Sequence, residues 1–119
     1  MNANSNRVHQ AIRRYLELKG YEVLEDEWFH GQDKVDFIAL DGECLVFVTA
    51  EATMNTGSGI PAVSFERATF ERIAAAYITE ADIAECEVRF DTVSMLILSE
   101  DRGLIRHNVN ALGTPLEVG

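Results

Sequence analysis

Residues 34–51, with the sequence KVDFIALDGECLVFVTAE, contain the stretch that decides the fold. Residues 34–40 and 45–51 are rich in valine, isoleucine, leucine and phenylalanine, which are typical of strands. The Asp41-Gly42 pair between them is a strong signal for a hairpin turn, because both residues tolerate the backbone angles that tight turns need. The sequence therefore predicts a β-hairpin here.

Helical patterns lie on both sides of this hairpin. Residues 6–19 place apolar side chains on a narrow stripe, and a second stripe follows Ser64, the residue expected to cap its helix. This second stripe consists of Phe70, Ile73, Ala74 and Tyr77. Further strands are expected at residues 21–24, 88–98 and 104–109. The order α-β-β-β-α-β-β predicts an α/β fold with a mixed central β-sheet and flanking helices.

The connecting segments also have recognisable compositions. We expect the acidic run Glu25-Asp26-Glu27 to end the first strand or to mark an exposed edge. Residues 30–33 are a predicted turn, and residues 53–59, which are small and polar, are a predicted loop. The last residues, 113–119, are expected to form a loose end.

The chain has 119 residues, of which 47% are hydrophobic and 25% charged, so we expect one globular domain spanning residues 1–119. Its formal charge of −10 argues against non-specific nucleic-acid binding. No apolar run is long enough to span a membrane, and no apolar signal segment precedes the first helix. Cys44 and Cys86 form neither a disulfide framework nor a zinc pattern. We therefore expect a cytoplasmic protein without a membrane partner.

The hairpin brings chemically useful side chains to one face. Alternate residues of a strand share a face, so Lys34 lies beside Asp36, and Thr49 lies beside Glu51 on the partner strand. A turn of either two or four residues places both pairs on the same face. Two carboxylates and a lysine therefore meet, and His9 on a covering helix is able to approach them.

Short segments along the chain match a known family in their order and spacing. They are Arg14-Tyr15-Leu16, Gly20-Tyr21-Glu22-Val23-Leu24, Val35-Asp36-Phe37-Ile38-Ala39, Leu45-Val46-Phe47-Val48, Gly59-Ile60-Pro61-Ala62-Val63-Ser64, Arg89-Phe90-Asp91-Thr92-Val93, Ile105-Arg106-His107 and Asn110-Ala111. In these segments the chain resembles the YraN-type family of small bacterial proteins. That family has the restriction-endonuclease-like fold of the PD-(D/E)XK nucleases, so the resemblance implies a metal-dependent nuclease core.

The chain departs from this family at most of the positions that would carry the chemistry. Family members have Gly-Glu in the first helix, Gly-Glu-Ile-Asp on one strand and Glu-Val-Lys on the next. Their carboxylates would hold a divalent metal, and their lysine would orient or activate water. At these places the present chain has Val8-His9, Asp33-Lys34-Val35-Asp36 and Thr49-Ala50-Glu51. Of the motif it keeps only Asp36.

Two interpretations of this site follow. The first is a nuclease-like protein with a degenerate, non-catalytic site and no cofactor, in which Asp36 pairs with Lys34 or caps a backbone group. The second is an active nuclease that holds Mg²⁺ or Mn²⁺ on Asp36 and Glu51. In that case Lys34 would replace the lost lysine, and Thr49 or His9 would complete the ligand shell.

Binding functions would use other surfaces. The candidate contacts to DNA lie on the first helix and are Arg7, Arg13, Arg14 and Lys19. The same residues also fit an ordinary solvated helix face, and binding to DNA would be weak at a net charge of −10. The alternative is a module for protein contacts or homodimer formation. Trp28-Phe29 would then be an exposed anchor, unless its rings cover the sheet edge.

The remaining histidines and Asp91 have simpler interpretations. His30 and His107 show no metal-ligand spacing with His9, and we expect all three histidines at the surface. Asp91 is expected to pair with Arg89 or to accept a backbone N–H near a strand start.

Overall fold

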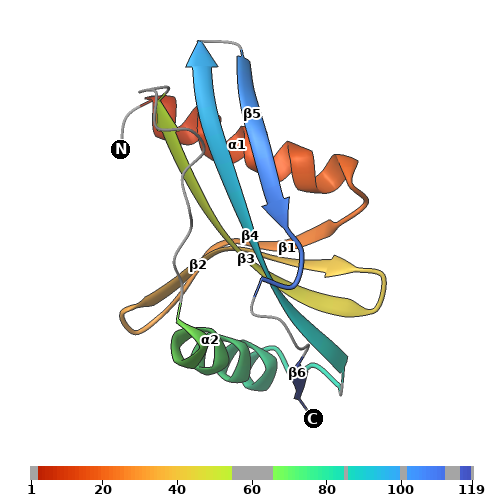
Figure 1. The fold of residues 1–119 in the computed structure, drawn as a ribbon. Helices are drawn as coiled ribbons and strands as arrows, with labels where there is room; N and C mark the ends of the chain where they lie inside the picture. The colour runs from red at the N-terminus through yellow and green to blue at the C-terminus, as the bar shows by residue number, and fades with distance from the viewer. Residues whose placement is uncertain (1–2, 55–65, 85, 100–101, 112–115, 119) are drawn as a thin grey trace.

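The computed structural model describes residues 3–54, 66–84, 86–99, 102–111 and 116–118. The described part contains two helices and six strands (Figure 1). They are α1 (Ala3–Leu18), β1 (Glu22–His30), β2 (Asp33–Asp41), β3 (Cys44–Met54), α2 (Arg67–Glu80), β4 (Cys86–Ser99), β5 (Arg102–Asn108) and β6 (Leu116–Val118). The mixed α/β class and the order α-β-β-β-α-β-β are confirmed, and β6 is an additional short strand.

The strands form one mixed sheet with the order β1-β2-β3-β4-β5. β1, β2 and β3 pair antiparallel in succession, β3 and β4 run parallel, and β5 returns antiparallel to β4. The connection between β3 and β4 includes α2, as a parallel pair requires a crossover. Gly42 in the predicted turn has φ of 62°, a left-handed conformation that favours glycine.

The acidic run does not end β1, since the strand pairs with β2 as far as His30, but it lies on an edge strand of the sheet, which is the expected alternative. Two other expectations about the ends of segments are wrong. The expected loose end contains β6, which pairs with the start of β4. Thr53 and Met54 belong to β3 rather than to the predicted loop. The rest of that loop, and Ser64 as the predicted cap of α2, lie outside the described residues.

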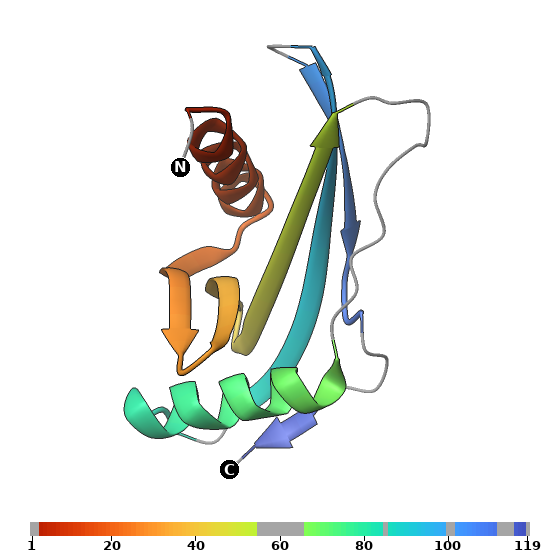
Figure 2. The same ribbon diagram turned by 90° about the vertical axis from the view of Figure 1, so that its left-hand side faces the viewer.

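The two helices cover opposite faces of the sheet, and Figure 2 shows them at different ends of it. Side chains of β3 alternate between the two cores, as expected for a strand that is buried on both faces. Phe47 packs with Phe70 of α2, whereas Val48 packs with Ile12 and Leu16 of α1. The predicted stripe of α2 is buried as expected. Neither described helix is long and apolar enough to cross a membrane.

The hairpin of β1 and β2 changes its orientation halfway along. Val35 belongs to the core under α2, whereas Phe37 belongs to the core under α1. Residues two apart on a regular strand share a face, so β2 is irregular between these two positions. Glu27 on β1 lies across from this point and has φ of 55°, which is a left-handed conformation. Asp36, the central residue of the predicted site, is therefore at a kink in the sheet.

Candidate functional site

Asp36 lies where β2 separates from β3. The backbone pairing of the two strands stops one residue short of it. One oxygen of its carboxylate accepts hydrogen bonds from the backbone N–H of Ala50 (2.8 Å) and from the hydroxyl of Thr49 (3.1 Å). The other oxygen lies 3.3 Å from the Nζ of Lys34. The Asp36 side chain thus provides a hydrogen-bond acceptor for a backbone N–H of β3 that lies beyond the pairing with β2.

Glu51, the second predicted metal ligand, is exposed on β3 two residues beyond Thr49. In the parallel pairing with β4 it lies next to Ser94. Among the residues that the structure describes, no group of three or more His, Cys, Asp or Glu side chains is arranged to hold a metal ion. Asp36 with Glu51 would be a weak ligand set for a hard cation, because the hydroxyl of Thr49 adds no charge.

His9 lies against a different face of the sheet from Thr49. Its ring stacks on Phe37, with centroids 4.4 Å apart, and it also pairs with Asp26 of β1. Phe37 belongs to the core under α1, whereas Thr49 occupies the position after Phe47 on the α2 side of β3. The structure therefore brings Lys34 and Thr49 to Asp36 and directs His9 elsewhere.

The predicted basic face of α1 is partly neutralised within the chain. Arg13 donates a hydrogen bond to Asp26 (2.8 Å) and lies 3.5 Å from Glu17. The Nζ of Lys19 lies over the ring of Tyr15, 5.8 Å from its centroid, in a cation–π contact. The other two predicted contacts to DNA, both exposed on α1, are Arg7 and Arg14.

A cluster of polar side chains surrounds a buried carboxylate between α1 and the sheet, and we call it the Asp91 network. Its members are Tyr15, Tyr21, Asp41, Arg89, Asp91 and His107. Asp91 is completely buried. Its carboxylate accepts hydrogen bonds from the Tyr21 hydroxyl (2.9 Å), from Nε of Arg89 (2.9 Å) and from the backbone N–H of Asn110 (2.9 Å).

His107 links this carboxylate to α1. Its Nε2 lies 2.8 Å from Asp91 and its Nδ1 lies 3.1 Å from the hydroxyl of Tyr15. An ionised carboxylate only accepts hydrogen bonds, so Nε2 carries the proton. Arg89 extends the network in the other direction, because its guanidinium donates to Asp41 (3.0 Å) and to the Tyr21 hydroxyl (2.6 Å).

The network keeps Asp91 ionised. Burial alone would raise the pKa of this carboxyl, but the hydrogen bonds from His107 and Arg89 outweigh burial and lower the pKa to about 2. Burial and the neighbouring Asp91 raise the pKa of Tyr21, which therefore remains a donor at neutral pH. The paired charges of Arg89 and Asp91 explain how both are tolerated inside the protein.

The sequence interpretation found part of this network. Both expected partners of Asp91, the side chain of Arg89 and a backbone N–H, are confirmed. The expected surface position of His107 is wrong, since its side chain is only 7% exposed. The sequence did contain a signal for the burial of His107. His107 lies two residues after Ile105 on the same strand, so the two side chains share a face, and Ile105 packs against the α1 core.

The two rings of Trp28-Phe29 differ in burial. Trp28 is half-buried and packs edge-to-face on Tyr77 of α2, with centroids 5.2 Å apart. Phe29 is 61% exposed. His30, exposed as expected, stacks on Trp28. One ring therefore covers the sheet and the other remains available to a partner.

Comparison with known proteins places the chain in a family. The family model described as "Uncharacterised protein family UPF0102" matches residues 9–95. A UPF0102 protein of Chlorobaculum tepidum is 34% identical over 96 residues, which cover 78% of this chain and 74% of the relative. One from Geobacter sulfurreducens is 31% identical over 100 residues, or 82% of this chain and 78% of the relative. A third, from Beutenbergia cavernae, is 34% identical over 97 residues, which cover 79% of this chain and 82% of the relative. The chain therefore belongs to the uncharacterised protein family UPF0102.

Proposed function

We propose that this protein is a nuclease-like member of its family that does not cleave nucleic acid and acts by binding. The observation that carries the proposal is the use of Asp36 by the chain itself. Its carboxylate accepts the N–H of Ala50 and the hydroxyl of Thr49 and pairs with Lys34. The one acidic residue kept from the nuclease motif thus has a structural role.

A metal ion at this place would meet two obstacles. It would have to displace the ammonium group of Lys34, which lies 3.3 Å from the carboxylate of Asp36. It would also have to compete with the N–H of Ala50 for the second oxygen. Since a backbone N–H deprived of its partner costs about 1–3 kcal/mol, metal binding would be opposed by the stability of the sheet.

The state of the α1 cations favours a protein partner over DNA. Arg13 is engaged by Asp26 and Glu17, and Lys19 lies over Tyr15. The two carboxylates at Arg13 offset a cation that would otherwise neutralise phosphate, and the net charge of −10 repels a polyanion as a whole.

The test combines metal binding with stability. Mn²⁺ is titrated calorimetrically into the wild type and into Asp36→Asn, with and without a branched DNA duplex, and cleavage of the duplex is followed on gels. We expect no saturable heat that depends on Asp36 and no cleavage. Heat or cleavage that disappears in Asp36→Asn would refute the proposal and favour the active Mg²⁺- or Mn²⁺-dependent nuclease.

A pair of variants measures the structural role separately. Asparagine at position 36 can still accept the N–H of Ala50, whereas alanine cannot. We therefore expect Asp36→Ala to lower the free energy of unfolding by about 1–3 kcal/mol and Asp36→Asn to lower it by less. Equal stability of Asp36→Ala and the wild type in urea would contradict the assigned role.

A further inference from the structure

The two edges of the sheet differ in how open they are. β1 at one edge carries four acidic residues, a break in register and the left-handed Glu27. Such charges and irregularities discourage a further strand from pairing. β5 forms the opposite edge and pairs only with β4 in the described sheet. Alternate residues of β5 therefore direct backbone N–H and C=O groups away from the sheet.

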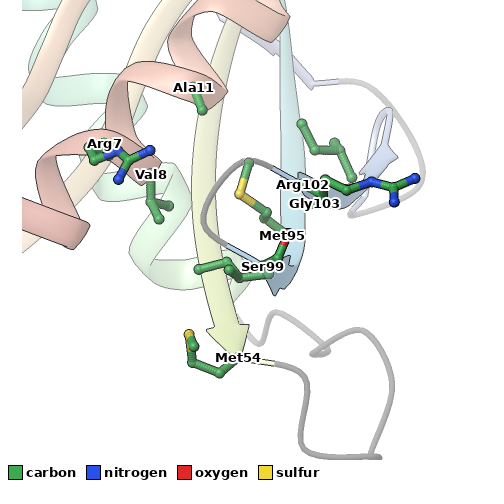
Figure 3. A pocket seen from close by; sticks show the side chains of 10 residues that line it. Arg7, Val8, Ala11, Met54, Met95, Ser99, Arg102 and Gly103 are labelled. Carbon is green, nitrogen blue, oxygen red and sulfur yellow. The ribbon is translucent and has the colours of Figure 1, made fainter.

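A cleft lies beside this open edge, between the first half of α1 and the ends of β3, β4 and β5. Its volume is about 460 Å³. Figure 3 shows Val8 and Ala11 of α1 on one side and Met95 of β4 and Gly103 of β5 on the other. The lining is mainly apolar, and methionine side chains such as Met95 adapt their shape to different ligands.

β5 carries positive charge, whereas the whole molecule is acidic. Arg102 and Arg106 are exposed on this strand, which contains no acidic residue, although the chain has a net charge of −10. A strand that pairs with β5 and complements these two arginines would therefore be acidic.

We propose that β5 and the adjoining cleft bind an extended, acidic peptide segment of a protein partner, which adds to the sheet as a further strand. The proposal rests on the binding function proposed above and names its surface and partner class. Added strands gain affinity from backbone hydrogen bonds and specificity from pockets for alternate side chains.

The position of the cleft defines which side chains the peptide needs. Alternate residues of an added strand point to the α1 side of the sheet, where the cleft and Ile105 present apolar surface. The intervening residues point to the other side, where Leu104 is 50% exposed and Arg106 is also exposed. The matching segment has apolar residues at alternate positions and acidic residues between them.

The test uses a synthetic peptide of defined sequence, acetyl-ELEVELE-amide, carrying a fluorophore. Its affinity for the full chain is measured by fluorescence anisotropy, and its contact surface is mapped by amide chemical shifts. The peptide acetyl-KLKVKLK-amide is the charge control. We expect saturable binding of the acidic peptide alone, with shifts concentrated in β5 and in the cleft residues of α1.

Paired variants locate the surface. Ala11→Trp fills the cleft from an exposed helix position, and Gln10→Trp adds the same ring to a residue that does not line the cleft. We expect about tenfold weaker binding for Ala11→Trp, the scale of one lost anchor pocket, and unchanged binding for Gln10→Trp. Arg102→Glu should weaken binding at low salt, and this loss should shrink as salt rises, whereas Arg67→Glu on α2 should have no effect.

Several outcomes would overturn the inference. They are equal binding of both peptides, shifts outside β5 and the cleft, or Ala11→Trp binding as tightly as Gln10→Trp. A concentration-dependent dimer in sedimentation that Ala11→Trp abolishes would assign the surface to a second copy of the chain instead. None of these outcomes affects the cleavage test, so a failure here leaves the absence of nuclease activity to be judged separately.

Discussion

Replacing Asp91 by asparagine probes the buried network most directly. The substitution keeps the shape of the side chain but removes the charge that faces Arg89 and His107. Within the part of the chain that the structure describes, Arg89 would retain Asp41 as its one acidic partner, and that side chain is 42% exposed. Breaking a buried ion pair by neutralising one partner typically costs about 3–5 kcal/mol. Because Asp41 remains, we expect Asp91→Asn to cost about 3 kcal/mol.

The pH dependence of stability in acid gives a second, independent magnitude for the contribution of Asp91. The pKa of Asp91 is about 2 in the folded chain, below its ordinary value of 3.8, so its ionisation stabilises the fold at pH values above 3.8. That contribution is about 2 kcal/mol at 1.36 kcal/mol for each pH unit, and it is lost as the pH falls from about 4 towards 2. Asp91→Asn cannot show this loss, so its stability should depend less on pH in this range.

The assay is urea unfolding followed by far-ultraviolet circular dichroism at pH 7 and at several values between pH 5 and pH 2.5. Asp82→Asn is the matched control, because Asp82 is exposed and its left-handed φ of 52° suits asparagine. A loss at pH 7 no larger than that of the control would refute the reasoning. So would a variant whose stability falls with acid as steeply as that of the wild type.

Three further substitutions test single contacts by the same urea assay. Tyr21→Phe removes a hydroxyl that donates to Asp91 and accepts from Arg89, and we expect a loss of about 1–2 kcal/mol. Gly42→Ala places a methyl group in open space but forces a left-handed backbone on alanine, which should cost about 1 kcal/mol and leave circular dichroism unchanged. Phe70→Ala empties a fully buried site under α2 and should cost about 3–5 kcal/mol; a loss below 1 kcal/mol would mean that α2 is not firmly packed.

Much of the fold follows from local patterns. The apolar composition of β2 and β3, the Asp41-Gly42 turn and the helical stripe of α2 each involve neighbours within a few residues, and the two strands, the turn and the buried stripe are confirmed. The errors concern places where pairing overrides composition. β3 continues through Thr53 and Met54 because β4 supplies their backbone partners, and β6 forms because the start of β4 offers it an edge.

The candidate site shows the same division. The meeting of Lys34 with Asp36 follows from their spacing on one strand. The sequence spacing does not predict that His9 and Thr49 lie on different faces of the sheet. That arrangement depends on which face α1 covers and on the kink at Asp36. Assigning faces by alternation assumes a regular strand. β2 changes its orientation at Asp36, the residue on which the predicted site depends.

By itself the sequence determined the family and the α/β order, since these are properties of residue types and their order. Only the tertiary structure decided that residues from Tyr15 to Asn110 meet around one buried carboxylate. It also decided that Asp36 accepts a hydrogen bond from the backbone of β3 where β2 no longer pairs, and that β5 is an open edge beside a cleft. The physical reason is that burial and hydrogen-bond partners arise between segments distant in the chain, where no local pattern records them.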